Sequence, residues 1–264
     1  MSLPDQETTP ARFREMIRKG EFTGPTPGHC PGYAQANLVI LPQEHAFHFL
    51  LFCQRNPRPC PVLEVLEPGC YEPKVMGPGA DIRTDLPRYR VWRKGELVDE
   101  PTEVKDLCGP DMVSFLVGCS FSFEEALENA GVGLRHIEEG VNVPMYRTNR
   151  ACNPAGPFQG PLVVSMRPLA PGLIPRAVEV TERFPAVHGA PLFVGGADDI
   201  GIKDISRPDF GDPVTIREGE IPVFWACGVT SSMAALAIKA DLVVTHAPGH
   251  MFVTDKLNKD IAQG

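Results

Sequence analysis

Two turns in the last third of the sequence carry side chains that could do chemistry, and the first follows an apolar run at 221–226. This turn places Cys227, Gly228, Thr230 and Ser231 where a helix is expected to begin. The free backbone N–H groups of a helix N-terminus bind carboxylates and oxyanions, and they also lower the pKa of a nearby thiol. We therefore expect Gly228, Thr230 and Ser231 to bind substrate and Cys227 to act as a nucleophile or proton carrier, unless Cys227 is simply buried and Thr230 only caps the helix.

The second turn carries two histidines after the apolar run 242–245. His246 and His250 lie beside glycine and proline, so they belong to a turn and not to a helical face. Imidazole titrates closest to neutral pH, which makes His246 a candidate acid or base and His250 a candidate substrate ligand. Their spacing also matches a metal-binding pair, but Pro248 and Gly249 prevent the regular helix that would bring both rings together. No metal site is predicted.

A turn in the middle of the chain combines a thiol, hydroxyl groups and a carboxylate. Cys119, Ser122 and Glu124 lie between Gly118 and an expected helix. Glu124 follows two phenylalanines, and burial there would raise its pKa toward the range of a general acid or base. The alternative is a first-turn carboxylate that interacts favourably with the helix dipole. Cys119 has the same two interpretations as Cys227, a reactive thiol or a buried apolar residue.

Other candidates are a histidine and several cations in polar turns. His188 lies in a glycine- and proline-rich turn and is a further candidate base. Arg147 and Arg167 are the best candidates to bind a carboxylate, because a planar guanidinium matches it with two hydrogen bonds. Asn149, two residues after Arg147, is expected to bind substrate with it. Arg83 is a further candidate to bind the carboxylate. For each arginine, the alternative is a salt bridge to a nearby acidic residue.

The elements that position the two C-terminal turns form a predicted strand, helix and strand. The runs 221–226 and 242–245 lack polar alternation, which is typical of parallel strands covered on both faces, and the alanine-rich segment between them suits a short helix. If these strands lie side by side, both turns share the carboxyl edge of one sheet, where ligands bind in open α/β folds. The alternative is an ordinary sheet edge with a buried cysteine and packing histidines.

The rest of the sequence predicts alternating helices and strands. The fold class is α/β, a mixed sheet with helices on both faces and a C-terminal βαβ unit. We expect one domain over 1–264, with any boundary between two lobes within 105–150. The predicted elements are helices at 8–20 and 43–55, a strand at 61–66, a hairpin turn at 94–95, a helical signal returning from 111 to 130, a strand at 161–167 and a helix at 174–184.

Composition excludes several classes of protein. Charged residues make up 22% and hydrophobic residues 43% of the 264 residues, and no apolar run is long enough for a membrane span. The net charge of -8, without a cluster of lysine and arginine, argues against nucleic-acid binding. Because the first residues lack a secretion signal, we expect a cytoplasmic protein whose eight cysteines are thiols.

Several segments, spread over nearly the whole chain, together resemble the D-glutamate cyclase family, whose bacterial members are often described as hydro-lyases. The segments that carry the resemblance are 31–37, 53–57, 81–89, 118–124, 142–149, 164–168, 187–191 and 221–250. The resemblance implies an α/β fold and closure of D-glutamate to 5-oxo-D-proline with loss of water. The chain departs from the family pattern at Phe193, Gly196 and Ser231-Ser232, where the family has histidine, aspartate and Pro-Gln, so these positions bear on the choice of substrate.

Closure of a glutamate-like substrate needs four kinds of group. The amine must lose a proton, attack the distal carboxyl carbon and form an oxyanion that expels water, so a carboxylate ligand, a base, oxyanion donors and an acid are required. We expect a hydro-lyase that uses general acid/base chemistry on a small carboxylate or amino acid, without a cofactor. The sequence leaves open whether the chain forms a homo-oligomer. The alternatives are an amidase or acyl transferase that uses Cys227 or Cys119, and a non-catalytic carboxylate-binding protein.

Overall fold

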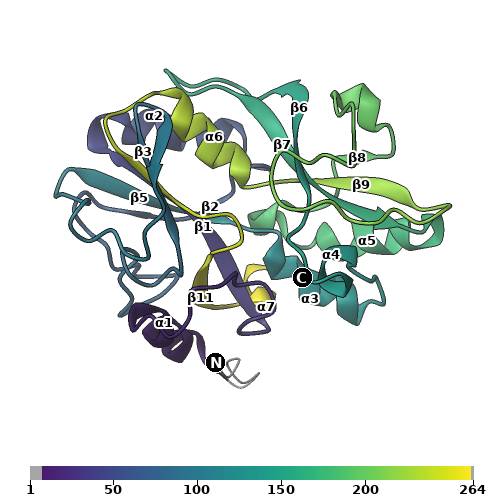
Figure 1. Ribbon diagram of the computed structural model, residues 1–264, viewed down its shortest axis with the longest axis horizontal. Helices are drawn as coiled ribbons and strands as arrows, with labels where there is room; N and C mark the ends of the chain where they lie inside the picture. The colour runs from purple at the N-terminus through teal and green to yellow at the C-terminus, as the bar shows by residue number, and fades with distance from the viewer. Residues whose placement is uncertain (1–7, 263–264) are drawn as a thin grey trace.

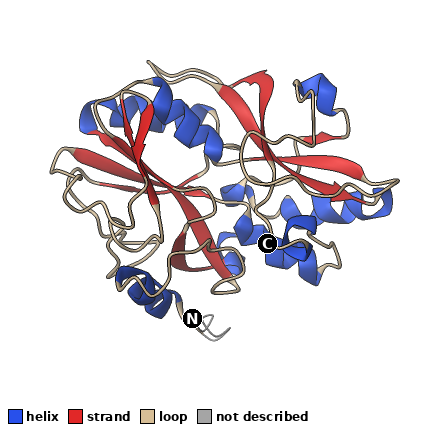
Figure 2. Cartoon of the chain, viewed as in Figure 1, coloured by secondary structure: helices blue, strands red, loops and turns tan. Residues whose placement is uncertain are grey.

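The computed structural model describes residues 8–262, which form two β-sheets with helices packed around them. One sheet has seven strands and the other has four. The two sheets lie side by side, with the N-terminal half of the chain on the left of Figure 1 and the middle of the chain on the right. Figure 2 shows that helices cover both sheets, so the molecule is a layered α/β structure.

The seven-stranded sheet is built around one apolar strand. Its strands are β1 (Tyr33–Pro42), β2 (Val62–Leu66), β3 (Tyr89–Arg93), β4 (Glu96–Asp99), β5 (Met112–Gly118), β10 (Val243–His246) and β11 (Phe252–Leu257). The order is β2-β5-β1-β10-β3-β4, and β11 also pairs with β1. Alternate side chains of β1 enter different cores, Leu38 and Ile40 on one face and Val39 and Leu41 on the other. Burial of both faces explains why residues 38–41 of β1 are all apolar.

Seven α-helices lie among the described residues. They are α1 (Pro10–Arg18), α2 (Gln43–Arg55), α3 (Phe121–Asn129), α4 (Arg135–Glu138), α5 (Ile174–Thr181), α6 (Val229–Ala237) and α7 (Asn258–Ile261). α1 begins after Thr9, whose hydroxyl accepts the N–H of Arg12 at 3.4 Å, a normal N-cap. α2 and α6 cover the Val39 face of the first sheet, where Phe49, Phe52 and Ala235 are fully buried.

The four-stranded sheet packs against a different set of helices. Its strands are β6 (Met145–Ala151), β7 (Pro161–Leu169), β8 (Phe193–Val194) and β9 (Ile221–Ala226), in the order β6-β7-β9-β8. Trp225 on β9 and Phe123 on α3 pack together in the core between this sheet and α3 and α5. Tyr146 and Phe224 face the opposite core. Each sheet therefore has its own apolar cores.

The predicted fold class and most predicted elements are confirmed. The structure is α/β, and the helices expected at 8–20 and 43–55 are α1 and α2. The strand expected at 161–167 lies within β7, and the helix expected at 174–184 contains α5. Lys94 and Gly95 form the hairpin turn between β3 and β4 with φ angles of 52° and 85°. A two-residue turn with both φ angles positive matches the twist of antiparallel strands, which is why a glycine belongs there.

The C-terminal strand, helix and strand occur in the predicted order, but the strands are not neighbours. β9 pairs with β7 and β8 in the second sheet, whereas β10 pairs with β1 and β3 in the first. All strand pairings among residues 8–262 are antiparallel. The expectation of a shared parallel edge is therefore wrong: α6 crosses from one sheet to the other. A central antiparallel strand covered on both faces is as apolar as a parallel one.

The helical signal expected from residue 111 is also wrong over its first part. Met112–Gly118 is strand β5, fully buried between β1 and β2, and the helix α3 begins only at Phe121. A short apolar run fits a buried strand and a buried helix equally well, and only its neighbours decide.

The chain passes from the first sheet to the second between β5 and β6 and returns between β9 and β10. The lobe boundary expected within 105–150 stays a prediction. In the part of the chain that is described, no helix combines the length and apolarity needed to cross a membrane.

Candidate active site

Reactive side chains from both sheets meet in one small cavity. Cys119 follows β5, Cys227 follows β9, His246 ends β10 and His188 lies after the 3-10 helix Pro185–Val187, and all four line the cavity. The structure thus brings together four of the predicted catalytic residues although their strands belong to different sheets. The cavity volume is about 30 Å³. This is room for about one or two water molecules, so a dicarboxylate enters only if side chains of the wall move.

Two glycines allow the turns of this cavity to approach their neighbours closely. A Cβ on Gly118 would collide with the backbone oxygen of Ala186, and a Cβ on Gly228 would collide with the amide of Asn37. Asn37 itself donates through Nδ2 to the Gly118 oxygen at 2.8 Å. Asn37 on β1 therefore joins the turn after β5 to the turn after β9.

We expect Gly118→Ala to destabilise the protein by about 1–3 kcal/mol, because backbone cannot move aside as a flexible side chain does. The free energy of unfolding, measured by urea denaturation, checks this. Gly172→Ala is the matched control, since no heavy atom lies within 4 Å of a Cβ placed there. Equal unfolding midpoints for the two variants would contradict the close approach.

His188 is a buried base held in an unusual backbone conformation. It is 1% exposed and has a φ of 89°, a left-handed conformation that is costly for a residue other than glycine. Its Nδ1 lies 2.8 Å from the carbonyl oxygen of Arg58, so Nδ1 carries the hydrogen and donates. Nε2 is buried without a hydrogen-bond partner. The neutral ring therefore presents an unpaired acceptor in the wall of the cavity.

His246 is the second buried imidazole of the cavity wall. Its Nδ1 accepts the backbone N–H of Leu38 at 3.2 Å and is 3.4 Å from the Leu38 oxygen. Burial lowers the pKa of His188 and of His246 to about 4. For His188 the carbonyls of Arg58 and Gly118 favour the charged form but do not outweigh burial. Both rings are consequently neutral at pH 7 and able to accept a proton.

The two lowered pKa values predict a pH dependence of stability. Between the ordinary value of 6.5 and about 4, the unfolded chain binds more protons than the folded chain, so stability falls as the pH falls through this window. Urea denaturation at pH 7, 6 and 5 measures the slope. The variant His246→Gln should show a shallower slope than the natural chain over this range. An unchanged slope would show that His246 does not titrate as described.

The two cysteines of the cavity are not activated thiols. Burial raises the pKa of Cys227 to about 11 and raises that of Cys119 further, although each sulfur also accepts a backbone N–H, from Val229 and Phe121 respectively. The expectation that the helix N-termini lower these pKa values is therefore wrong. Desolvation disfavours the thiolate more than the helix N–H groups favour it.

Glu124 lies behind the cavity in a buried ion cluster and does not line it. Its Oε1 is 2.5 Å from Nη2 of Arg167 and 3.0 Å from Nε2 of His136. Burial acts to raise the pKa of Glu124, but the charges of His136 and Arg167 outweigh it and hold the pKa below its ordinary value. The expected rise in the pKa of Glu124 is wrong. Glu124 lies in the first turn of α3, as the alternative interpretation had it.

Arg167 reaches the cavity only through a hydroxyl. It is 1% exposed, and besides Glu124 it donates to Ser165 at 3.1 Å and to Ser120 at 3.2 Å. Ser120 lines the cavity and Arg167 does not. The salt bridge weighed as the alternative for Arg167 is present, and it positions the turn that carries Cys119.

Arg147 and Asn149 lie apart from the cavity, on the exposed part of β6. Nε of Arg147 is 4.0 Å from a carboxylate oxygen of Asp209, and its guanidinium lies over the ring of Phe210. Asn149 donates to the backbone oxygen of Asp199 at 3.4 Å. Because neither residue lines the cavity, their expected contact with substrate stays a prediction that this conformation does not favour.

Three predicted hydroxyl ligands are engaged by backbone groups instead. The Thr230 hydroxyl accepts an N–H of β7 at 3.0 Å, that of Ser231 donates to the oxygen of Gly228 at 2.7 Å, and that of Ser122 accepts the N–H of Gln35 at 3.0 Å. None of the three lines the cavity, although Gly228 does. The bond of Ser122 joins α3 to β1 and that of Thr230 joins α6 to β7, whereas the bond of Ser231 stays within the first turn of α6.

His250 and Arg83 do not line the cavity, although Pro248, the partner of His250, does. Nδ1 of His250 lies 2.8 Å from the oxygen of Pro248, and burial lowers the pKa of His250. Arg83 pairs with Asp81 at 2.8 Å and lies over the ring of Tyr71. Within residues 8–262, no group of three or more His, Cys, Asp or Glu side chains is arranged to hold a metal ion.

Sequence reasoning did not single out Asn37, Asn142 and Met145, which line the cavity, or His136, which pairs with Glu124. Asn37 had a signal, since it is a polar residue inside the apolar run of β1. Asn142 has a buried Oδ1 without a hydrogen-bond partner in the described structure. Nothing in the sequence marks His136, because its role depends on the distance between α3 and α4.

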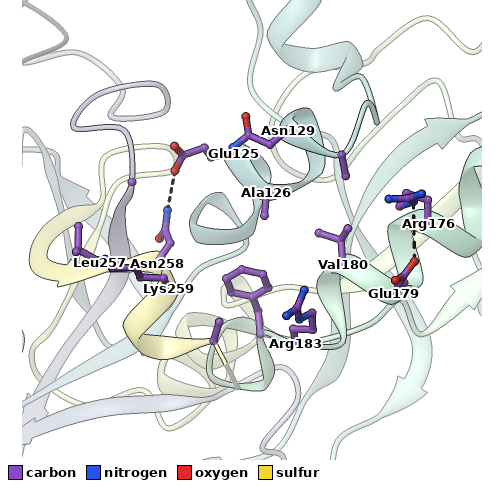
Figure 3. Close-up of a pocket in the computed structure, with 14 residues that line it drawn as sticks. Glu125, Ala126, Asn129, Arg176, Glu179, Val180, Arg183, Leu257, Asn258 and Lys259 are labelled. Carbon is purple, nitrogen blue, oxygen red and sulfur yellow. Dashed lines mark hydrogen bonds and ion pairs between the residues drawn. The ribbon is translucent and has the colours of Figure 1, made fainter. Parts of the chain in front are cut away.

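A larger cavity of about 810 Å³ lies between α3, α5 and α7 (Figure 3). Its lining contains no histidine, cysteine or hydroxyl side chain. The smaller cavity instead brings two neutral imidazoles and two thiols together from both sheets, so it is the candidate active site despite its size.

Comparison of the sequence with known proteins identifies its family. A family model described as D-glutamate cyclase matches residues 113–255, a range that includes both cysteines and both histidines of the cavity. A protein from Geobacillus kaustophilus, named as a candidate hydro-lyase, is 62% identical over 242 residues, which cover 92% of each chain. Another, from Rubrobacter xylanophilus, is 61% identical over 93% of this chain and 95% of its own.

A solved structure of a nitrogen repressor-like protein from Methanococcus jannaschii aligns with a TM-score of 0.35 and 6% identity, over 95% of this chain and 99% of its own, and supports no further argument. The similarity to the sequence relatives is much stronger, because identity near 60% extends over more than nine tenths of both chains. The chain belongs to the D-glutamate cyclase family.

Proposed function

We propose that the chain closes D-glutamate, or a closely similar amino-dicarboxylate, to its five-membered lactam with loss of water in the cavity between the two sheets. Family membership and the hydro-lyase names of the relatives support the class of reaction, a carbon–oxygen lyase. The observation that carries the proposal is the unpartnered Nε2 of His188 in the wall of a cavity that also holds a second neutral imidazole.

In this mechanism His188 transfers the protons. The substrate ammonium group gives one proton to the distal carboxylate and a second to Nε2, and its nitrogen forms a bond to the distal carboxyl carbon. The tetrahedral intermediate then breaks one carbon–oxygen bond, and the proton held on the imidazole leaves with the hydroxyl group as water. A base with a pKa near 4 is weak but fully deprotonated at neutral pH, so it is ready to accept the proton.

The surrounding groups stabilise charge on the substrate. Gly228 lies at the start of α6, where backbone N–H groups and the helix dipole favour an oxyanion. The Ser120 hydroxyl, bonded to Arg167, and the amide of Asn142 are available to the carboxylates, whereas Nδ2 of Asn37 donates to the backbone oxygens of Val117 and Gly118. Met145 and Met251 form part of the wall, and their flexible side chains are suited to move when substrate enters.

Incubation with D-glutamate and with L-glutamate, followed by proton NMR, tests the proposal directly. We expect signals of the lactam ring from the D-enantiomer, at a rate well above that of a sample without protein. Thermal shifts with a panel of dicarboxylates run in parallel. Binding without turnover across the panel would contradict catalysis and favour a carboxylate-binding protein.

Conversion of each cavity cysteine to serine separates acid/base catalysis from a cysteine-dependent acyl transfer. Because burial keeps both thiols protonated, we expect Cys119→Ser and Cys227→Ser to retain turnover within about tenfold. Loss of a covalent nucleophile typically costs more than about 10³-fold in kcat. Turnover measured by NMR under identical conditions decides, and a loss of that size in either variant would support the amidase alternative.

A further inference from the structure

The larger cavity, between α3, α5 and α7, shares no lining residue with the candidate active site. Its volume of about 810 Å³ lies within the range of small-molecule sites in proteins. Apolar side chains form part of its wall, among them Val180, Phe184 and Leu257. A small-molecule site needs polar groups at fixed positions to select a ligand. The larger cavity has two sets of such groups, one of hydrogen-bond acceptors and one of cations.

The first set is a pair of acceptors next to one another on α3 and α7. Asn258 is 9% exposed, and its Nδ2 donates to Oε2 of Glu125 at 3.3 Å while its backbone N–H donates to the oxygen of Gly32 at 2.7 Å. Its Oδ1 is buried and has no partner among the described residues. Buried polar atoms are nearly always paired, so this oxygen calls for a donor that the described chain does not supply.

The second set is cationic. Arg183 lies across the cavity from Glu125 and Asn258, whereas Lys259 follows Asn258 at the start of α7 (Figure 3). Arg176 is partly neutralised by Glu179 at 3.9 Å. Over residues 8–262, neither Arg183 nor Lys259 lies within 4.0 Å of a carboxylate oxygen. Both cations are therefore available to an anionic group.

We propose that this cavity binds a zwitterionic ligand of the amino-acid class, with apolar side chains and about the size of a dipeptide. The ammonium group donates to the carboxylate of Glu125 and, once the Asn258 side chain rotates, to its Oδ1, the carboxylate accepts from Arg183, and the side chains pack on Phe184. A zwitterion matches the arrangement because its opposite charges face the carboxylate of Glu125 on one side and the guanidinium of Arg183 on the other. The site is independent of the proposed cyclisation.

Calorimetric titration of the full chain with leucyl-leucine tests the proposal without reference to turnover. We expect saturable binding, weakened about tenfold or more in the amide of the peptide, which lacks the carboxylate, and in its N-acetyl form, which lacks the ammonium group. Equal affinities for the three peptides, or no binding of any of them, would overturn the proposal.

Variants locate the binding on the cavity. Arg183→Gln and Glu125→Gln should each weaken leucyl-leucine binding about tenfold, whereas Arg207→Gln, which lies outside the cavity lining, should leave it unchanged. Circular dichroism confirms that each variant is folded, and the three-peptide comparison on the natural chain stands even if one is not. Unchanged affinity in both cavity variants would place the peptide elsewhere and contradict the assignment.

Discussion

His188→Asn lowers the rate of D-glutamate closure by about 10²- to 10⁴-fold, the usual contribution of a general acid/base, and leaves the fold intact. Asparagine tolerates a positive φ better than other non-glycine residues, and its amide can donate to the Arg58 carbonyl in place of Nδ1. It cannot accept and return a proton. Turnover by NMR and the thermal midpoint, measured on the same preparation, separate the two effects.

The control for this variant is His45→Asn, which alters a half-buried histidine on α2 outside the cavity lining. We expect its turnover to equal that of the natural chain. Turnover of His188→Asn within about threefold of the control would remove His188 from the mechanism. In that case His246, the other neutral imidazole of the cavity, would be the remaining histidine candidate for the base.

Glu124→Gln destabilises the protein by about 3–5 kcal/mol, the cost of breaking a buried ion pair from one side. The substitution removes the carboxylate that neutralises Arg167, and the guanidinium then stays buried with only uncharged partners. The glutamine amide keeps the shape of the side chain, so the loss measures charge and not packing. Urea denaturation at pH 7 gives the free energy of unfolding.

An exposed acidic residue provides the comparison. Glu15 on α1 pairs with Arg12 and Lys19 at the surface, where water screens the charges. Glu15→Gln should leave the unfolding midpoint nearly unchanged. If Glu124→Gln is as stable as Glu15→Gln, the buried cluster behind the cavity does not hold the turn of Cys119 and Ser120 in place.

Local signals in the sequence were sufficient for many individual elements. The helices expected at 8–20 and 43–55 and the turn at Lys94-Gly95 depend on residues close in the chain, and the structure contains each of them. The two thiols and two imidazoles of the cavity could also be named, because they lie in glycine-rich turns after apolar runs, but its asparagines and methionines could not. These inferences use backbone preferences and short-range contacts, which the sequence states directly.

Pairing of the strands could not be read in the same way. The runs that became β5 and β9 are apolar because each is covered on both faces, and apolarity alone does not distinguish helix from strand or parallel from antiparallel neighbours. Cys227 and His246 do lie in one cavity, but they arrive there from different sheets and not from a shared parallel edge.

The sequence by itself determined the types of groups available: thiols, imidazoles and a carboxylate in turns, with glycines where the backbone must pass closely. Only the tertiary structure decided which of these groups are ionised and which are already paired. Whether a thiol is activated, a histidine neutral or an arginine free to bind substrate depends on burial and on the charges nearby. Cys227, His188 and Arg167 acquire these properties from elements that are distant in the chain, which is why neither the raised thiol pKa nor the buried arginine cluster could be foreseen.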